Sequence, residues 1–434
     1  MKPVNGKETL VLGLALLLLL ITPVSRQILH DGLPVGEQAY SELVSAQSPG
    51  SLYYWLLGLV EGFPVVYLFV LMGVASLLVF YSLITRFGPE ERTLMALLLV
   101  TSPAFIYTFS SLNVHAFSVL LMLVAIKLLI ENKEMSYPAL FILLVTATLS
   151  LFGALLALIV LFIYFNARKS REAMAALLAS FFMVLLYYIM FNPEKIIVSA
   201  GSMSRQFFSS TGAISGYSLL FALLAIIGFL ALWKKKSMAY SALVFLLAAY
   251  FFFGSTANTY LVFVLSVFAG EGLYLLLKRR WALKFIKHLS MAIIILGVLF
   301  STATYYPRLV SGGPDKAVVE SFEAMEDLPD GMVLSHCSNT YWINYFSVHK
   351  AFIDDCSEKQ KMETAKKIFY ATDIEAAQAA LKENSVRYIW IDPDMKRGQV
   401  WDTAQQGLLF LFRNSETFKN IYRGSGIEVW QVLE

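Results

Sequence analysis

Long hydrophobic runs dominate the first 306 residues of the chain. Most of them are long enough to cross the hydrocarbon core of a bilayer, about 30 Å thick, as single α-helices. The pattern therefore predicts a polytopic α-helical membrane protein. The runs lie near residues 9–24, 65–85, 93–108, 114–130, 138–165, 173–191, 217–233, 238–253, 259–277 and 289–306.

The run at 138–165 is long for one span and short for two, and Gly153 lies in its middle. A hairpin of two short helices that turns at Gly153 places seventeen Lys and Arg residues of the first 306 positions on one side of the membrane and three on the other. Cytoplasmic loops are enriched in basic residues. A single crossing would put the basic groups at 168–171, 234–236 and 278–287 outside. We therefore predict the hairpin, eleven transmembrane helices and a cytoplasmic N-terminus.

The first hydrophobic segment follows Lys2 and Lys7, as a secretory signal would. The sequence that closes it, Thr22–Arg26, is a poor match to a small-x-small cleavage site. We expect a retained helix, and the transmembrane domain is predicted to span residues 1–306.

Residues 307–434 have the punctuation of a soluble domain, which eleven crossings place outside the cytoplasm. Apolar runs alternate with helical patterns here, which predicts an α/β domain with a mainly parallel sheet closed by a hairpin. Asp373 is a plausible N-cap. The expected elements are strands Met332–Ser335, Ala351–Asp354 and Val386–Ile391, helices Thr340–Phe346 and Ile374–Lys382, and a hairpin of Phe418–Tyr422 with Ile427–Val432 that turns at Gly424 and Gly426.

Composition supports a membrane location for the chain and narrows its function. Of the 434 residues 58% are hydrophobic and only 15% are charged, with a mean hydropathy of +0.64. These values exclude a soluble enzyme, a nucleic-acid binder and a disordered scaffold. The net charge of +3 is too small to indicate an acidic partner.

The first outer loop, residues 25–64, carries the candidate chemistry. Gly and Pro residues predict a turn ahead of Glu37, and an aromatic stretch at 53–55 is typical of an interfacial segment. Glu37 and Glu42 are five positions apart, about 140° round a helix, so only one of them can point into a common site. Composition alone would make these acids solvated loop residues.

The architecture resembles the GT-C superfamily of lipid-phosphosugar-dependent membrane glycosyltransferases. The shared features are a cytoplasmic start, one helix, a long outer loop with an acidic residue, about a dozen spans and an outer C-terminal domain. The string Gly-x-Pro-x-Gly-Glu-x-x-Tyr at 32–40 is similar to first loops of archaeal members. Ser48–Gly50 stands where the protein mannosyltransferase group has His-Pro-Pro-Leu.

The resemblance implies transfer of a sugar from a polyprenyl-phosphate donor to a glycan, lipid or protein acceptor on the extracytoplasmic face. It implies that Glu37 is the catalytic base, with Asp31 as second choice, and that Tyr40 belongs to the substrate-binding set. In the oligosaccharyltransferase branch the same carboxylate helps to bind a metal, so a divalent cation is compatible with the resemblance. A carboxylate takes the acceptor proton as charge develops on the nucleophile.

A cation near the phosphate would stabilise the leaving group. Arg205 and Arg308 are the candidate phosphate contacts, although interfacial snorkelling explains each of them equally well. Asn113 and His115 lie at the outer start of the 114–130 span, where they either line the site or cap the helix. We expect no metal cluster from spacing alone, because His336, Cys337, His349 and Cys356 do not form a zinc signature.

Cys337 and Cys356 are the only cysteines and lie in the domain predicted outside the cytoplasm, where disulfides form. If the strands that precede them are parallel neighbours, both thiols lie at the same edge of the sheet and a bridge follows; the alternative is two buried free thiols.

Two other classes of protein stay open. A secondary transporter has as many spans, but transporters usually carry ionisable residues near the midplane. Here the span interiors are nearly free of charge, which favours chemistry at the outer surface. A non-catalytic lipid-binding or assembly subunit is the third alternative.

Overall fold

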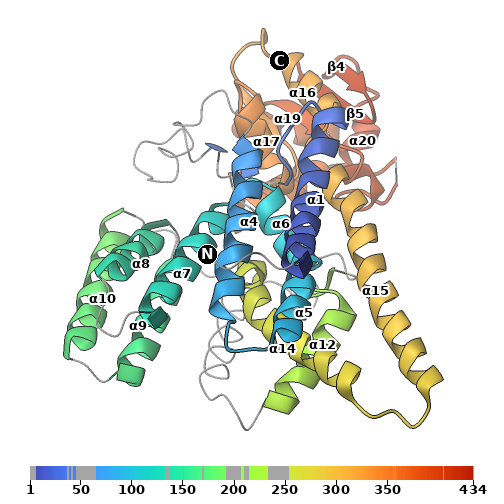
Figure 1. Ribbon diagram of the computed structural model, residues 1–434. Helices are drawn as coiled ribbons and strands as arrows, with labels where there is room; N and C mark the ends of the chain where they lie inside the picture. Colours follow the sequence, from blue (N-terminus) through green and yellow to red (C-terminus); the bar gives the residue numbers. More distant parts are fainter. Residues whose placement is uncertain are drawn as a thin grey trace. The chain divides into compact units, whose positions relative to one another are not determined.

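The chain folds into two units that do not follow the order of the sequence. The first comprises Met1–Arg26 with Gly50–Ser311, and the second Gln27–Pro49 with Gly312–Glu434. They are described separately, from a computed structural model (Figure 1). The structure describes residues 6–36, 39–40, 43–44, 65–131, 137–149, 151–168, 171–191, 207–209, 215–232, 254–354, 356, 358–403 and 405–433.

The first unit is helical wherever the structure describes a regular element, apart from one isolated bridge. Its helices overlap the predicted hydrophobic runs, except for the run at 238–253, which lies outside the described residues. The helices are α1 (Gly6–Leu29), α4 (Val65–Leu83), α5 (Pro89–Val100), α6 (Pro103–Ser110), α7 (Val114–Glu131), α8 (Tyr137–Leu149), α9 (Leu151–Arg168), α10 (Arg171–Phe191), α12 (Leu219–Leu232), the 3₁₀ turn η3 (Gly254–Ala257), α14 (Asn258–Lys278) and α15 (Lys284–Ser311).

Four helices among the described residues are long and apolar enough to cross a membrane, and the bent pair of α5 and α6 adds a fifth candidate. They are α1, α4, α14 and α15, whereas α8, α9, α10 and α12 contain shorter apolar segments. A helical membrane region is therefore confirmed, and the count of eleven spans stays a prediction.

The run at 93–108, predicted as one span, is not one continuous helix. The structure breaks it into α5 and α6, which meet at an angle of 63°. Pro103 begins α6, and a proline disfavours helical backbone in the residue before it. The Thr302 hydroxyl donates to the carbonyl of Thr101 at 2.9 Å, which satisfies one backbone group at the break. Every residue of α6 is buried.

The run at 138–165 contains two helices, as predicted, but α8 ends at Leu149 and α9 begins at Leu151, so Gly153 sits within α9 and not between the helices. A glycine inside a helix costs only about 1 kcal/mol relative to alanine, and packing outweighs such a cost. Helices α8 and α9 pack against each other and, with α7 and α10, form one group (Figure 1).

Helices α12 and α14 approach closely because glycines face each other where they cross. A Cβ on Gly228 would lie 1.8 Å from the carbonyl oxygen of Phe268, and one on Gly272 would lie 2.2 Å from that of Leu224. Small residues at such crossings let helix backbones pack closely in a membrane.

Helices α1 and α15 extend beyond the predicted ends. The Tyr306 hydroxyl donates to the carbonyl of Leu18, and Arg26 Nη1, on a fully buried side chain, donates to the carbonyl of Val310 at 3.0 Å. In the structure α15 runs to Ser311 and the second unit resumes at Gly312, whereas the domain boundary after residue 306 stays a prediction.

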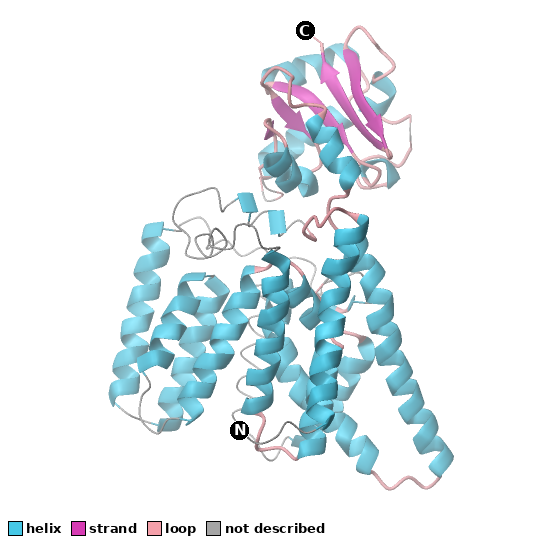
Figure 2. Cartoon of the chain, turned by 45° about the horizontal axis from the view of Figure 1, so that its top comes forward, coloured by secondary structure: helices cyan, strands magenta, loops and turns pink. Residues whose placement is uncertain are grey.

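The second unit is an α/β domain around one five-stranded sheet (Figure 2). The strand order is β2-β1-β3-β5-β4; β2, β1 and β3 are parallel, and β5 pairs antiparallel with both β3 and β4. The strands are β1 (Met332–Leu334), β2 (Lys350–Ala351), β3 (Val386–Ile391), β4 (Phe418–Gly424) and β5 (Ile427–Val432), and the helices are α16 (Lys316–Glu323), η4 (Cys337–Asn339), α17 (Thr340–Phe346), α18 (Lys359–Phe369), α19 (Ile374–Glu383), η5 (Met395–Arg397) and α20 (Leu408–Leu411).

Both faces of the sheet are buried under helices. Alternate residues of a strand point to opposite faces, so one strand contributes to both cores. On β3, Tyr388 and Trp390 pack with α16 and α17, whereas Ile389 and Ile391 pack with α18, α19 and α20. The indole of Trp390 donates to Ser321 at 2.8 Å, so its polar atom is satisfied within the core.

Several predicted elements of this domain are confirmed, among them α17, β3 and the hairpin of β4 and β5. Asp373 caps α19 by accepting from the amide of Ala376 at 3.0 Å. The strand predicted at 351–354 is shorter and ends at Ala351, because the carbonyl of Ile353 instead accepts from the Thr340 hydroxyl at 2.7 Å.

Candidate functional site

Asn113 and His115 lie together at the start of α7. The Asn113 side-chain oxygen accepts from the amide of His115 at 2.9 Å, so Asn113 caps the helix as a polar N-cap residue does. The Asn113 side chain is 1% exposed, and its Nδ2 has no hydrogen-bond partner among the described residues. Buried donors are normally paired, so an unpaired one at a helix start is a candidate ligand contact.

His115 connects α7 to α14. Its Nδ1 lies 3.2 Å from the hydroxyl of Tyr260, and which of the two atoms donates depends on the tautomer. The rings of His115 and Tyr260 also contact edge to face. Phe152 of α9 packs on the ring of Tyr260, with 4.8 Å between the centroids. Side chains of α7, α9 and α14 therefore meet at the ring of Tyr260.

Arg308, near the end of α15, belongs to the same polar region. Its Nη1 donates to the carbonyl of Ser209 at 2.8 Å. The amide of Ser209 in turn donates to the carbonyl of Tyr217, whose hydroxyl donates to the carbonyl of Asn258 at 2.9 Å. Asn258 and Tyr260 share the first turn of α14, so these contacts lead from Arg308 to His115 and Asn113.

A chain of contacts through Ser209, Tyr217 and the first turn of α14 thus links three predicted site residues, Asn113, His115 and Arg308, in a polar region of the first unit. Sequence reasoning missed Tyr217 and Tyr260, which connect them. The signal was present at Asn258–Tyr260, where polar residues begin a span just as Asn113 does in α7, but tyrosine is so common in apolar runs that it does not stand out. Arg205 lies outside the described residues.

The first-loop string lies in the second unit, and its residues on both sides of position 37 are anchored. Gly36 adopts a φ of +88°, and a Cβ on Gly313 would lie 2.7 Å from its amide, so the two segments pass closely. On the other side the Tyr40 ring is fully buried, with centroids 5.2 Å from those of Tyr345 and Phe346. The ring of Tyr40 therefore has a packing role.

The two predicted acids of this loop have different outcomes. Asp31 is exposed and adopts a left-handed conformation with φ of +52°, which a short polar side chain tolerates. Glu37 lies outside the described residues, so its catalytic role stays a prediction. Among the described residues no group of three His, Cys, Asp or Glu side chains could hold a metal ion, and we derive no step through one.

Cys337 and Cys356 form a disulfide, with their Cα atoms 5.1 Å apart. Cys337 follows β1 and is buried, and β1 and β2 are parallel neighbours. The bridge therefore joins the segments that follow adjacent strands.

No protein-family model and no curated protein matches the sequence. Solved structures do match. The apo oligosaccharyltransferase of Archaeoglobus fulgidus has a TM-score of 0.61 at 13% identity, covering 98% of this chain and 74% of that one. Oligosaccharyltransferase AglB of the same organism, in complex with an inhibitory peptide and a dolichol-phosphate, has a TM-score of 0.57 at 12% identity, covering 99% and 75%.

Apo ArnT from Cupriavidus metallidurans has a TM-score of 0.53 at 12% identity, covering 98% of both chains. Both AglB and ArnT are GT-C glycosyltransferases. At these identities the likeness shows the fold alone, which the chain shares with the oligosaccharyltransferase and ArnT structures.

Proposed function

We propose that the chain is a membrane glycosyltransferase that moves a sugar from a polyprenyl-phosphate donor to an acceptor on the extracytoplasmic face. The observation that carries the proposal is the fold, which matches two different GT-C enzymes over nearly the whole chain. One matching structure, that of AglB, contains a dolichol-phosphate, which is the class of leaving group that the proposal requires. The similarity of the string at 32–40 to archaeal first loops is the reason to favour the archaeal type.

The polar region of the first unit supports the same proposal. It joins the starts of α7 and α14 to the residues just before α12 and to the end of α15. The basic residues of the loops predict that all four of these helix ends lie on the outer side. A polar region there suits the phosphate of a lipid whose tail stays in the bilayer.

We assign the roles by chemistry. The Nδ2 of Asn113, which has no partner among the described residues, would donate to a phosphate oxygen. Arg308, which is exposed and held by the carbonyl of Ser209, would neutralise the departing polyprenyl phosphate. Glu37 would take the proton of the attacking acceptor group, and Asp31 is the second choice for this base.

Turnover of defined donors by the purified full-length protein in nanodiscs tests the proposal. A panel of short-chain polyprenyl-phosphate sugars would be incubated with membrane extract as the acceptor source, and released polyprenyl phosphate would be followed by mass spectrometry. We expect at least one donor to be consumed only when the protein is present. A folded protein that consumes none, but carries a solute across a proteoliposome membrane, would favour a transporter.

Lipid binding tests the assigned contacts separately from turnover. Native mass spectrometry with polyprenyl phosphate should show weaker binding for Asn113→Leu and for Arg308→Ala. Lys278→Ala is the matched control, because this cation lies at the opposite end of α14 and pairs with Glu90 at 3.2 Å. Equal binding by all three variants would remove both residues from the site.

A further inference from the structure

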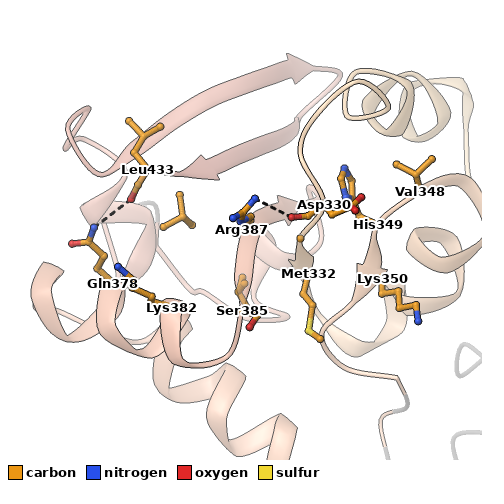
Figure 3. A pocket seen from close by; sticks show the side chains of 13 residues that line it. Asp330, Met332, Val348, His349, Lys350, Gln378, Lys382, Ser385, Arg387 and Leu433 are labelled. Atoms are coloured by element: carbon orange, nitrogen blue, oxygen red, sulfur yellow. Dashed lines mark hydrogen bonds between the residues drawn. The ribbon is translucent and has the colours of Figure 1, made fainter.

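A cavity of about 700 Å³ lies at the end of the sheet where the parallel strands of the second unit begin (Figure 3). The starts of the parallel strands β1, β2 and β3 form part of its lining, together with the end of β5 and the last turns of α19. Its volume is in the range of sites that bind small molecules or short segments of a partner. Figure 3 shows Gln378, Lys382 and Leu433 to one side of Arg387 and Met332, Val348 and Lys350 to the other.

Positive charge predominates in this lining. Lys350 begins β2, Lys382 lies in the last turn of α19, and Arg387 belongs to β3. All three side chains are exposed, and the acid that lines the cavity with them is Asp330. The cations come from three elements, so the fold itself gathers them, and no run of basic sequence is needed.

Arg387 is held in place within the cavity. Its Nη1 donates to the backbone carbonyl of Asp330 at 3.1 Å, a contact visible in Figure 3. Its aliphatic stem lies across Gly331, where a Cβ would come within 2.6 Å of the Cβ of Arg387. The absence of a side chain at position 331 therefore sets the path of the arginine.

His349 adds a buried polar group to the lining. Its side chain is 3% exposed, its Nε2 lies 3.0 Å from the carbonyl of Met325, and its ring packs on Tyr388. Its Nδ1 has no hydrogen-bond partner among the described residues. Buried polar atoms are normally paired, so this nitrogen is unusual among the groups that line the cavity.

The lining also contains apolar side chains that are exposed to water. Met332 is 38% exposed and Val348 is 64% exposed, and Val432 and Leu433 also line the cavity. Exposed apolar groups beside a charged rim are typical of a protein-binding surface. The occupant should therefore carry both anionic and apolar groups.

The occupant is not expected to add a strand to the sheet beside β2, although β2 is an outermost strand. The amide of Ala351, which β2 would offer to a new strand, already donates to the side-chain oxygen of Asn344 at 3.0 Å. Recognition must then come from side chains, as when cationic clusters bind acidic motifs.

The opposite end of the sheet, where the parallel strands end, is less suited to a ligand. Ligands of open α/β sheets usually bind at the carboxyl ends of the strands. There Asn339 donates to Ser335 at 3.2 Å and to Asp392 at 2.9 Å, and Asp392 also accepts from the amide of Met395. These polar groups satisfy one another.

We propose that the cavity at 330–332, 348–350 and 385–387 binds an acidic peptide segment of a partner protein, with carboxylates on Lys350, Lys382 and Arg387 and apolar side chains on Met332 and Val348. Charge complementarity and the apolar wall favour this occupant over a purely polar anion. The binding site goes beyond the proposed function, because it needs no sugar donor and no transfer.

Fluorescence anisotropy on the full-length protein in nanodiscs tests the proposal. The probe is a fluorescein-labelled peptide, Asp-Leu-Glu-Val-Asp, compared with the neutral Asn-Leu-Gln-Val-Asn and with Asp-Ser-Glu-Ser-Asp, which lacks the apolar groups. We expect the first to bind most tightly, and to weaken as salt is raised. Equal binding of the neutral peptide would overturn the proposal.

Charge reversal locates the site. Lys382→Glu combined with Arg387→Glu should weaken binding of the acidic probe by about 10-fold or more. Lys359→Glu is the matched control, because this exposed lysine begins α18 and does not line the cavity. If the double variant does not fold, Lys350→Glu with Lys382→Glu changes two exposed side chains and should give the same loss. Unchanged binding in either folded double variant would refute the site.

The same assay separates the chemical classes of occupant. Acidic oligosaccharide and vesicles containing phosphatidylglycerol would each be added as competitors. Poor competition by both supports a peptide, whereas displacement of the probe at lower concentration by either would overturn the peptide assignment. None of these readouts depends on glycosyl transfer, so their failure would leave the proposed function standing.

Discussion

Removing the disulfide should loosen the second unit by a predictable amount. The bridge between Cys337 and Cys356 closes a segment with a sequence separation of 19. In the chain-entropy model a loop of this size stabilises the folded state by about 3 kcal/mol. Cys337 also packs in the core with Leu334 and Phe352, so the double variant Cys337→Ala, Cys356→Ala adds a small packing loss.

Hydrogen exchange measured by mass spectrometry gives the local readout. Because 1.4 kcal/mol corresponds to a factor of ten, protection of the β3 amides at 386–391 should fall about 10²-fold in the double variant. Helices α12 and α14 of the other unit should exchange as before. Treating the unaltered protein with a reductant should reproduce the loss, and the double variant should not respond to the reductant.

Two results would refute this reasoning. Under denaturing conditions without reductant, an alkylating agent should add no alkyl group; addition of two would mean that the bridge is absent. It would also weaken the prediction that this domain lies outside the cytoplasm. Unchanged protection of β3 in the double variant would show that the loop contributes no stability.

Three further predictions concern other contacts. Gly228→Leu should prevent α12 and α14 from packing, because even a Cβ would lie 1.8 Å from the carbonyl oxygen of Phe268, and the yield of monodisperse protein should drop while Leu230→Ala, at an exposed position, has little effect. Asp373→Ala should remove the cap of α19 and cost about 1 kcal/mol, measurable as faster exchange at 374–383. Burial lowers the pKa of His336 below its usual 6.5, partly offset by Asp392, so the free energy of unfolding of the second unit should decrease as the pH falls below about 6.5, and His336→Gln should flatten this dependence in thermal unfolding between pH 7.5 and 5.

The sequence predicts the membrane helices well because long apolar runs need no tertiary information. It does not predict how a run bends. Apolar runs flank the Thr101–Ser102 pair on both sides, so hydropathy continues across the break, and Pro103 was the local signal of it. The strands of the second unit were predictable because short apolar runs between turns fix their position. The early end of β2 was not predictable, because it depends on a hydrogen bond from Thr340 to the carbonyl of Ile353 that no sequence pattern reveals.

The candidate site was predicted in part. Asn113 and His115 stood out because polar residues at the start of an apolar span are uncommon. Their partner Tyr260 lies 145 positions from His115, and such a pairing is not visible in a single sequence. The same limit applies to Tyr40, whose string was recognised by resemblance but whose packing against Phe346 depends on the fold.

The central claim, sugar transfer by a first-loop carboxylate, is tested most directly by Glu37→Gln. The variant keeps the size of the side chain and removes the base. In the turnover assay we predict a loss on the order of 10²-fold or more in the rate of sugar transfer, with the lipid still bound. Glu42→Gln, five positions away in the same loop, should retain transfer. Unchanged transfer by a normally folded Glu37→Gln protein would contradict the account.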